Sequence, residues 1–290
     1  MSQQQTGAYY VPHGSRWPII AAVGLFIFMW GAAHWLDGIE PEGPILLFAG
    51  MAILIFMFFG WFREVIHESL KGMYNAQVDV SFRMGMMWFI FSEVMFFGAF
   101  FGALFYSRGL QVPWLSGEGH GALTNYYLFR HYTGGWPTNG PDAIGGPFEV
   151  VPPWGEPLIN TLILLTSSVT ITIAHHALRD GNRRRMLPWL ILTPILGMTF
   201  VGLQAREYMD AYTHLNLTLH SGIYGATFFL LTGFHGLHVT LGSIMLWVIA
   251  YRAWRGHFSK EHHFAFEAVA WYWHFVDIVW LGLFLFVYIM

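Results

Sequence analysis

Long apolar runs separated by short polar segments dominate this chain. Seven runs approach or exceed the roughly 20 residues that a helix needs to cross a bilayer. They predict membrane-spanning helices at residues 17–36, 44–62, 83–107, 157–177, 187–205, 221–251 and 265–290. Segment 108–156 is polar, rich in glycine and aromatic residues and without helical period, so we expect a long external loop there. No internal repeat or soluble domain stands out, so the pattern predicts a single all-α, polytopic transmembrane domain over residues 1–290.

Composition supports a membrane protein and excludes several kinds of site. Hydrophobic residues make up 55% of the chain and charged residues only 11%, against about 25% charged in a typical soluble domain. The absence of cysteine excludes disulfides, thiolate metal sites and cysteine nucleophiles. No long basic tract or glycine-rich phosphate loop is present, so a nucleic-acid partner is not expected. The first sixteen residues are polar, and no cleavable signal peptide is expected.

The positive charges are distributed unequally between the two sides of this topology. Of the 14 Lys and Arg residues, 11 fall on one side, and only Arg108, Arg130 and Arg206 fall on the other. Cytoplasmic loops carry the excess of positive charge. The N-terminus is therefore predicted to be cytoplasmic (or in the matrix), and the C-terminus to lie on the opposite side.

One carboxylate, Glu93, interrupts the third apolar run near its middle. Counted from Arg83 at about 1.5 Å per residue, Glu93 lies roughly 15 Å into the membrane. An acid at that depth costs about 2.5–3.5 kcal/mol on insertion scales, and desolvation favours its neutral form. Either a proton-related site or a structural hydrogen bond between helices would account for it. His235 or His238, at similar depth in the sixth span, is the expected partner.

The 15 histidines raise the possibility of a metal site. His235 and His238 form an H-x-x-H pair about 300° apart around the helix, hence on neighbouring faces, at mid-membrane depth. His175 and His176 form a second pair, and His262 and His263 a third, in a basic loop. These pairs do not fit the histidine boxes of membrane di-iron desaturases and hydroxylases. Hydrogen-bonded helix packing is therefore favoured over a metal or haem site.

The seventh span carries three polar residues on one side. His274 lies about 20° and Asp277 about 80° around the helix from Glu267. Polar groups on one stripe of a membrane helix face protein or a cavity rather than lipid. We expect an interhelical hydrogen-bond seam here, with a polar docking surface or proton-holding group as the alternative.

A further candidate site follows the second span. Arg63, His67 and Lys71 are four residues apart and share one helical face, and Trp61 stands beside them. Basic and aromatic residues together at the inner interface suit an anionic phospholipid head group. The ordinary excess of positive charge on the inner side is the simpler interpretation.

Several motifs resemble one known family. They are Ser92-Glu-Val-Met-Phe-Phe97, Ala174-His-His-Ala-Leu178, Leu203-Gln-Ala-Arg-Glu-Tyr208, Tyr224-Gly-Ala-Thr-Phe-Phe229, Gly233-Phe-His-Gly-Leu-His-Val239 and Glu267-Ala-Val-Ala-Trp-Tyr-Trp-His-Phe-Val-Asp-Ile-Val-Trp280. Together they resemble subunit III of the haem–copper cytochrome c oxidases, from about Trp17 to the C-terminus. Segment 108–156 is longer than its mitochondrial counterpart.

This resemblance implies a role without redox chemistry. It implies an accessory subunit of a proton-pumping aa3-type oxidase in a bacterial or mitochondrial inner membrane. The chain would pack mainly on subunit I, with subunit II as a further partner, and would be associated with cytochrome c only through the complex. Haem and copper belong to the partner subunits. Phospholipid is expected in a cleft between two helices and the other five, with Trp61 and Arg63 matching the lipid-contact region. Glu93 matches the family's carbodiimide-reactive acid. A desaturase-type or hydroxylase-type metalloenzyme and a transporter that uses Glu93 remain the alternatives.

Overall fold

Every regular element of residues 14–290, the part of the chain that this computed structural model describes, is helical. Seven helices are long and apolar enough to cross a membrane: α1 (Trp17–Leu36), α2 (Glu42–Leu70), α3 (Ala76–Tyr106), α6 (Glu156–Arg179), α7 (Arg183–Thr213), α8 (Gly222–Trp254) and α9 (Phe264–Leu283). A π-helical segment, η3 (Phe284–Ile289), continues α9. The prediction of an all-α protein with seven membrane spans is confirmed.

The helices extend past the apolar runs from which they were predicted. α2 continues to Leu70 instead of ending at residue 62, and α7 continues to Thr213 instead of ending at residue 205. Hydropathy marks the part of a helix that lies in lipid. Polar residues with good helix propensity, such as Glu64 and Glu68, continue the helix beyond it.

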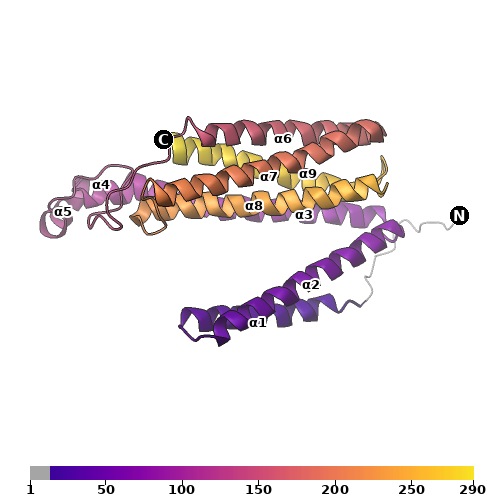
Figure 1. Cartoon of the computed structure of the whole chain (residues 1–290), viewed down its shortest axis with the longest axis horizontal. Coiled ribbons are helices and arrows are strands. Elements are labelled where there is room, and N and C mark those ends of the chain that lie inside the picture. The colour runs from indigo at the N-terminus through magenta and orange to yellow at the C-terminus, as the bar shows by residue number, and fades with distance from the viewer. Residues whose placement is uncertain (1–13) are drawn as a thin grey trace. The chain divides into compact units, whose positions relative to one another are not determined.

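The segment 108–156 contains more helix than its composition indicated. The third span continues through a π-helical segment, η1 (Ser107–Gln111), and α4 (Val112–Leu115), and η2 (Gly119–Gly121) and α5 (Ala122–Leu128) follow. The side-chain amide of Asn125 donates to the carbonyls of Leu115 (2.9 Å), Phe129 (2.9 Å) and Tyr132 (3.0 Å). These bonds run from one side chain to backbone carbonyls 4 to 10 residues away, which a test of hydrophobic periodicity does not detect. Figure 1 shows α4 and α5 beyond one end of the bundle of α6, α7, α8 and α9.

The chain divides into two compact units, Met1–Phe82 and Arg83–Met290. The first contains α1 and α2, and the second contains the other five spans, counting α3 from Arg83. The predicted arrangement of two helices plus five is confirmed. The lipid cleft expected between them stays a prediction.

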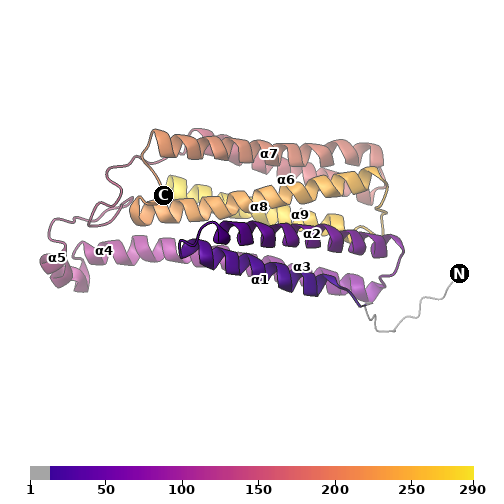
Figure 2. The ribbon, with the colours of Figure 1, turned by 60° about the horizontal axis from the view of Figure 1, so that its bottom comes forward.

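The first unit is a hairpin of α1 and α2 in close contact (Figure 2). Gly31 of α1 lies against the backbone at Leu46 and Leu47, and Gly50 of α2 lies against the backbone of Phe28. A Cβ at either glycine would collide with the main chain of the other helix. In lipid, the hydrophobic effect does not drive helices together. Small residues at the interface instead let the two helices approach closely and pack.

In the second unit α6, α7, α8 and α9 pack side by side (Figure 1). Two fully buried tryptophans of α9 connect them, and their indole Nε1 atoms donate to α6. Trp273 donates to Ser167 Oγ and Trp280 to Thr161 Oγ1, both at 2.9 Å. Gly242 of α8 leaves room for the Trp273 ring, since a Cβ there would meet its Cε3 at 2.9 Å. The serines and threonines of α6 therefore bind neighbouring helices, as expected in a membrane bundle.

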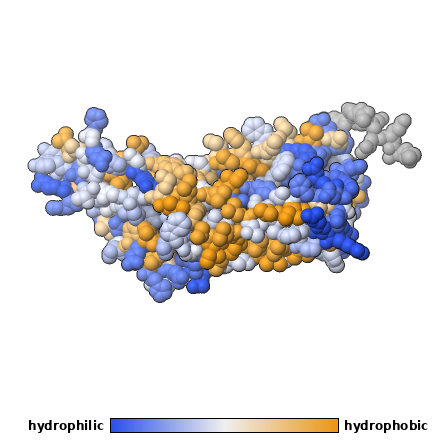
Figure 3. Space-filling view, turned by 90° about the horizontal axis from the view of Figure 1, so that it is seen from above, coloured by the Kyte–Doolittle hydropathy of each residue, from blue (hydrophilic) through white to orange (hydrophobic). Residues whose placement is uncertain are grey.

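Helix α3 packs against α8 and α9 through aromatic side chains. Phe96 contacts Phe234 of α8 with ring centroids 5.1 Å apart, and Phe97, which is 2% exposed, contacts Phe275 of α9. On the face drawn in Figure 3, hydrophobic residues cover the middle of the molecule and hydrophilic residues gather toward its ends. The aromatic contacts of Phe96 and Phe97 bring the middle of α3, with Glu93, against α8.

Candidate functional site

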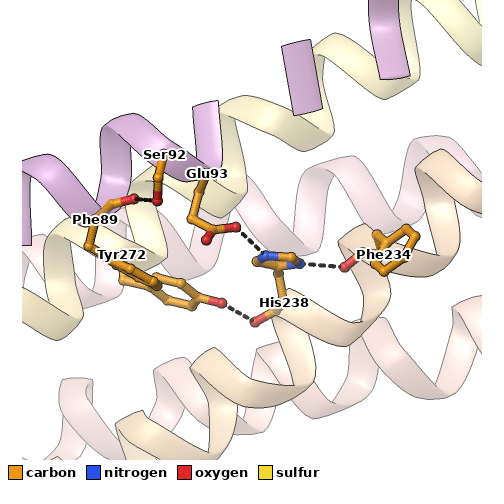
Figure 4. Close-up of polar contacts among 6 residues, drawn as sticks. All are labelled: Phe89, Ser92, Glu93, Phe234, His238 and Tyr272. Atoms are coloured by element: carbon orange, nitrogen blue, oxygen red, sulfur yellow. Dashed lines mark hydrogen bonds and ion pairs between the residues drawn. The ribbon is translucent and has the colours of Figure 1, made fainter. Parts of the chain in front are cut away.

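Glu93 and His238 form a hydrogen-bonded pair between α3 and α8. The Glu93 Oε2 atom lies 2.9 Å from His238 Nε2, and the two side chains are only 20% and 12% exposed. Figure 4 shows the carboxyl and the imidazole pointing toward one another. Of the two histidines expected as partners of Glu93, His238 is the one within hydrogen-bond distance.

The second nitrogen of His238 determines how many protons this pair holds. His238 Nδ1 lies 2.6 Å from the carbonyl oxygen of Phe234, and a carbonyl can only accept, so Nδ1 carries a proton. A neutral ring then has an unprotonated Nε2, and the carboxyl of Glu93 must donate to it. A protonated ring would donate from Nε2 to a carboxylate instead. In both arrangements one proton lies between Glu93 and His238.

Aromatic rings enclose the pair. The Phe97 ring meets the His238 ring at 5.1 Å, and Tyr272 of α9 donates from its hydroxyl to the His238 carbonyl at 3.3 Å. Tyr272 also stacks on Phe89 (Figure 4). Because these surroundings are apolar, a single neutral hydrogen bond costs less there than two separated ions.

His235 belongs to a different environment. It is fully buried, and its Nε2 donates to the Val276 carbonyl at 3.1 Å. Its ring lies 5.1 Å from Trp280 and 5.5 Å from Phe200. The two histidines of the H-x-x-H pair thus bond to different helices, His235 to α9 and His238 to α3.

The three polar residues of α9 bind more than one neighbour. Glu267 pairs with Arg83 of α3 at 2.5 Å, whereas His274 Nδ1 lies 2.6 Å from Ser168 Oγ of α6. Asp277 is 6% exposed, and its Oδ1 has no hydrogen-bond partner within residues 14–290. The common stripe predicted from the sequence is therefore divided between α3 and α6. In the sequence, Arg83 marked only the end of a span. The pair was not predicted because Glu267 is far from Arg83 along the chain.

Trp61, Arg63, His67 and Lys71 lie near the end of α2, with Lys71 as the residue after the helix, and all four are exposed. The Trp61 ring stacks on Phe62 at 5.6 Å. The helix places the three basic residues on one face, where they are available to an anionic head group. Their spacing required a helix, and α2 provides it.

Sequence reasoning missed one buried polar cluster. Tyr288 donates from its hydroxyl to Glu207 Oε1 at 2.6 Å, and Gln204 donates to the same oxygen at 3.3 Å. Gln204 and Glu207 stand three residues apart in α7, one helical turn, and this spacing was the available signal.

In the described part of the chain, no three His, Asp or Glu side chains are grouped as metal ligands. The rings of His175 and His263, from two different histidine pairs, lie 5.6 Å apart.

Comparison with known proteins identifies the family. A family model described as cytochrome c oxidase subunit III matches residues 7–116 and 132–290. Proteins named cytochrome c oxidase subunit 3 from Hippopotamus amphibius, Equus caballus and Formosania lacustris are each 41% identical over 285 residues, covering 98% of this chain and 97% of theirs. Residues 117–131, outside the family match, contain η2 and α5. Matched over nearly its whole length, this multi-pass membrane protein belongs to the cytochrome c oxidase subunit III family.

Proposed function

We propose that this chain is the non-redox accessory subunit of a proton-pumping, aa3-type cytochrome c oxidase in a bacterial or mitochondrial inner membrane. The observation that carries the proposal is the family match, which covers both compact units of the chain. In this proposal subunit I is the main contact and subunit II a further partner. Haem and copper stay in those partners, which receive electrons from cytochrome c.

The Glu93–His238 pair favours an auxiliary role for this chain in proton uptake and in sustaining enzyme turnover. One proton lies between the two side chains, and the rings of Phe97 and Tyr272 pack beside the His238 ring. An acid held in this way connects α3 to α8 and can exchange its proton without carrying an electron. Glu267, His274 and Asp277 would act as a hydrogen-bond seam that keeps α9 in place.

Phospholipid is the proposed ligand of the first unit. Trp61, Arg63, His67 and Lys71 offer an aromatic ring and exposed positive charge near the end of α2. We assign the basic side to the cytoplasm or matrix, with the N-terminus, because 11 of the 14 Lys and Arg residues fall there.

The decisive experiment separates this chain from its purified oxidase with mild detergent. We expect all haem and copper to remain with the other subunits, and the released chain to contain no stoichiometric haem, copper or iron. The depleted oxidase should begin turnover at nearly the normal rate and lose activity over fewer turnovers. Iron or haem retained by the released chain, with His235 or His238 as a ligand, would contradict the proposal.

A further inference from the structure

The cluster around Glu207 is among the most buried polar sites in the second unit. Glu207, Gln204 and Tyr288 are 3%, 5% and 8% exposed, although all three carry polar side chains. Tyr288 and Gln204 both donate to one oxygen of the carboxyl, Oε1. The other oxygen, Oε2, accepts from no residue within the described chain.

The packing of α6 against α7 brings Asn160 to this cluster. Glu156 pairs with Arg206 at 3.1 Å near one end of the two helices, and Thr170 bonds to Thr193 at 2.8 Å further in. These two contacts set the antiparallel register. Asn160, one turn inward from Glu156, therefore lies at the level of Gly202 and Leu203, with Gln204 as the next residue of α7.

A second chain of contacts, through α9, connects the neighbour of Asn160 to Glu207. Thr161, the neighbour of Asn160, accepts from the Trp280 indole. The Trp280 ring lies 5.8 Å from the Tyr288 ring, and Tyr288 donates to Glu207. Asn160 is fully buried, so its side chain faces the interior of the bundle, about one helical turn inward from the level of Glu207.

Four buried polar atoms in this part of the α6–α7–α9 interface have no hydrogen-bond partner among residues 14–290. They are Asn160 Nδ2, Asn160 Oδ1, Gln204 Oε1 and Glu207 Oε2. A buried polar atom without a partner costs about 1–3 kcal/mol, and most such atoms in proteins bind another group or ordered water. A cluster of four indicates a bound molecule that both donates and accepts.

We propose that at least one water molecule is bound between Asn160, Gln204 and Glu207, forming an internal hydration site of the α6–α7–α9 interface. Water can donate two hydrogen bonds to the oxygen atoms and accept one from Asn160 Nδ2. Buried waters typically make about three such bonds. A monovalent cation could use the three oxygens but offers no acceptor to the buried amide nitrogen.

The test is a structure of the intact oxidase at a resolution that shows ordered water. We expect density within hydrogen-bond distance of Asn160, Gln204 and Glu207, unchanged when sodium and potassium are replaced by a large organic cation. Direct side-chain bonds with no density between them would overturn the proposal, as would density that disappears without the small cations. The readout does not depend on turnover, so it stands apart from the proposed function.

Variants provide a second measurement. Asn160→Leu removes two of the four polar atoms while keeping the branching of the side chain, and we expect the density to be lost. Glu207→Gln keeps the shape and an acceptor, and the water should remain. Ile159→Leu is the matched control, because Ile159 is next in the chain but 51% exposed, and its density should equal that of the native protein. Retention of the density in Asn160→Leu would contradict the assignment.

Discussion

At the scale of single residues, the hydrogen bond between Glu93 and His238 carries the most chemical information. The sequence predicted the depth of Glu93 and limited its partner to two histidines, because both quantities follow from counting residues along straight helices. It could not choose between His235 and His238. That choice depends on how α8 is rotated against α3, which the aromatic contacts of Phe96 and Phe97 determine.

Substitution of Glu93 tests whether this acid is structural or an obligatory proton carrier. Glu93→Gln can still donate to His238 Nε2, so we expect most oxidase activity to remain. Glu93→Ala leaves a buried ring nitrogen unpaired, which should lower stability by about 1–3 kcal/mol and shorten the period of sustained turnover. Oxygen consumption followed over many turnovers, with thermal dissociation of the subunit, measures both effects.

Ser92→Ala is the control for this pair, since the Ser92 hydroxyl is exposed and bonds only to its own helix, at the Phe89 carbonyl. It should leave both readouts unchanged. If Glu93→Gln abolished turnover in an intact complex, the acid would be a required proton carrier rather than a structural group.

At the scale of helices, sequence reasoning was strong on number and weak on ends and partners. Apolar runs identified all seven spans. They did not show that the helix of span three continues to Leu115, or that Arg83 pairs with Glu267, since neither property depends on hydropathy. The close helix contacts at Gly31 and Gly50 could not be predicted from the sequence either. A glycine indicates close packing only once the backbone opposite it is known.

The α1–α2 hairpin should be sensitive to a single added carbon at Gly50. A Cβ there would overlap the Phe28 backbone, and overpacking costs about 1–3 kcal/mol. We therefore expect Gly50→Ala to lower the temperature at which the subunit loses its native helix packing. Ala49→Val, on the exposed neighbouring position, adds carbon without that collision and should have little effect. Equal thermal stability of the two variants would show that α1 and α2 pack less closely than described.

The α5 segment depends on one amide. Asn125 holds the carbonyls of Leu115, Phe129 and Tyr132, so Asn125→Ala should release residues 117–131 locally. We expect faster hydrogen exchange and faster proteolysis there, with assembly of the oxidase unaffected. Tyr127→Ala, at a 75% exposed position of the same helix, keeps all three bonds and should behave as the native protein. Unchanged exchange in the Asn125 variant would mean that other contacts hold the segment.

At the scale of the whole molecule, the family assignment replaces both alternatives that the residues alone left open. A histidine-rich membrane enzyme and a transporter share this composition, and hydropathy cannot separate them. The match of long motifs on α3, α8 and α9 does, since those residues include the buried tryptophans and the Glu93–His238 pair. The division into two helices plus five likewise agrees with the prediction. Lipid binding, which we expect between these units, is the property of the assembled molecule that now needs to be measured.

Arg63 provides that measurement. Its guanidinium is exposed near the C-terminal end of α2, where an anionic head group would gain both charge and hydrogen bonds. We expect Arg63→Ala to lower the phospholipid retained by the purified oxidase while the initial rate of oxygen consumption changes little, because in the proposed role this subunit carries no redox centre. Arg63→Lys keeps the charge and should retain more of the lipid than Arg63→Ala. Lipid mass spectrometry of the two variants in parallel, with thermal dissociation of the subunit, decides the matter. Unchanged lipid content and unchanged stability in Arg63→Ala would leave these residues with only the topological role that basic residues on the inner side of a membrane protein have.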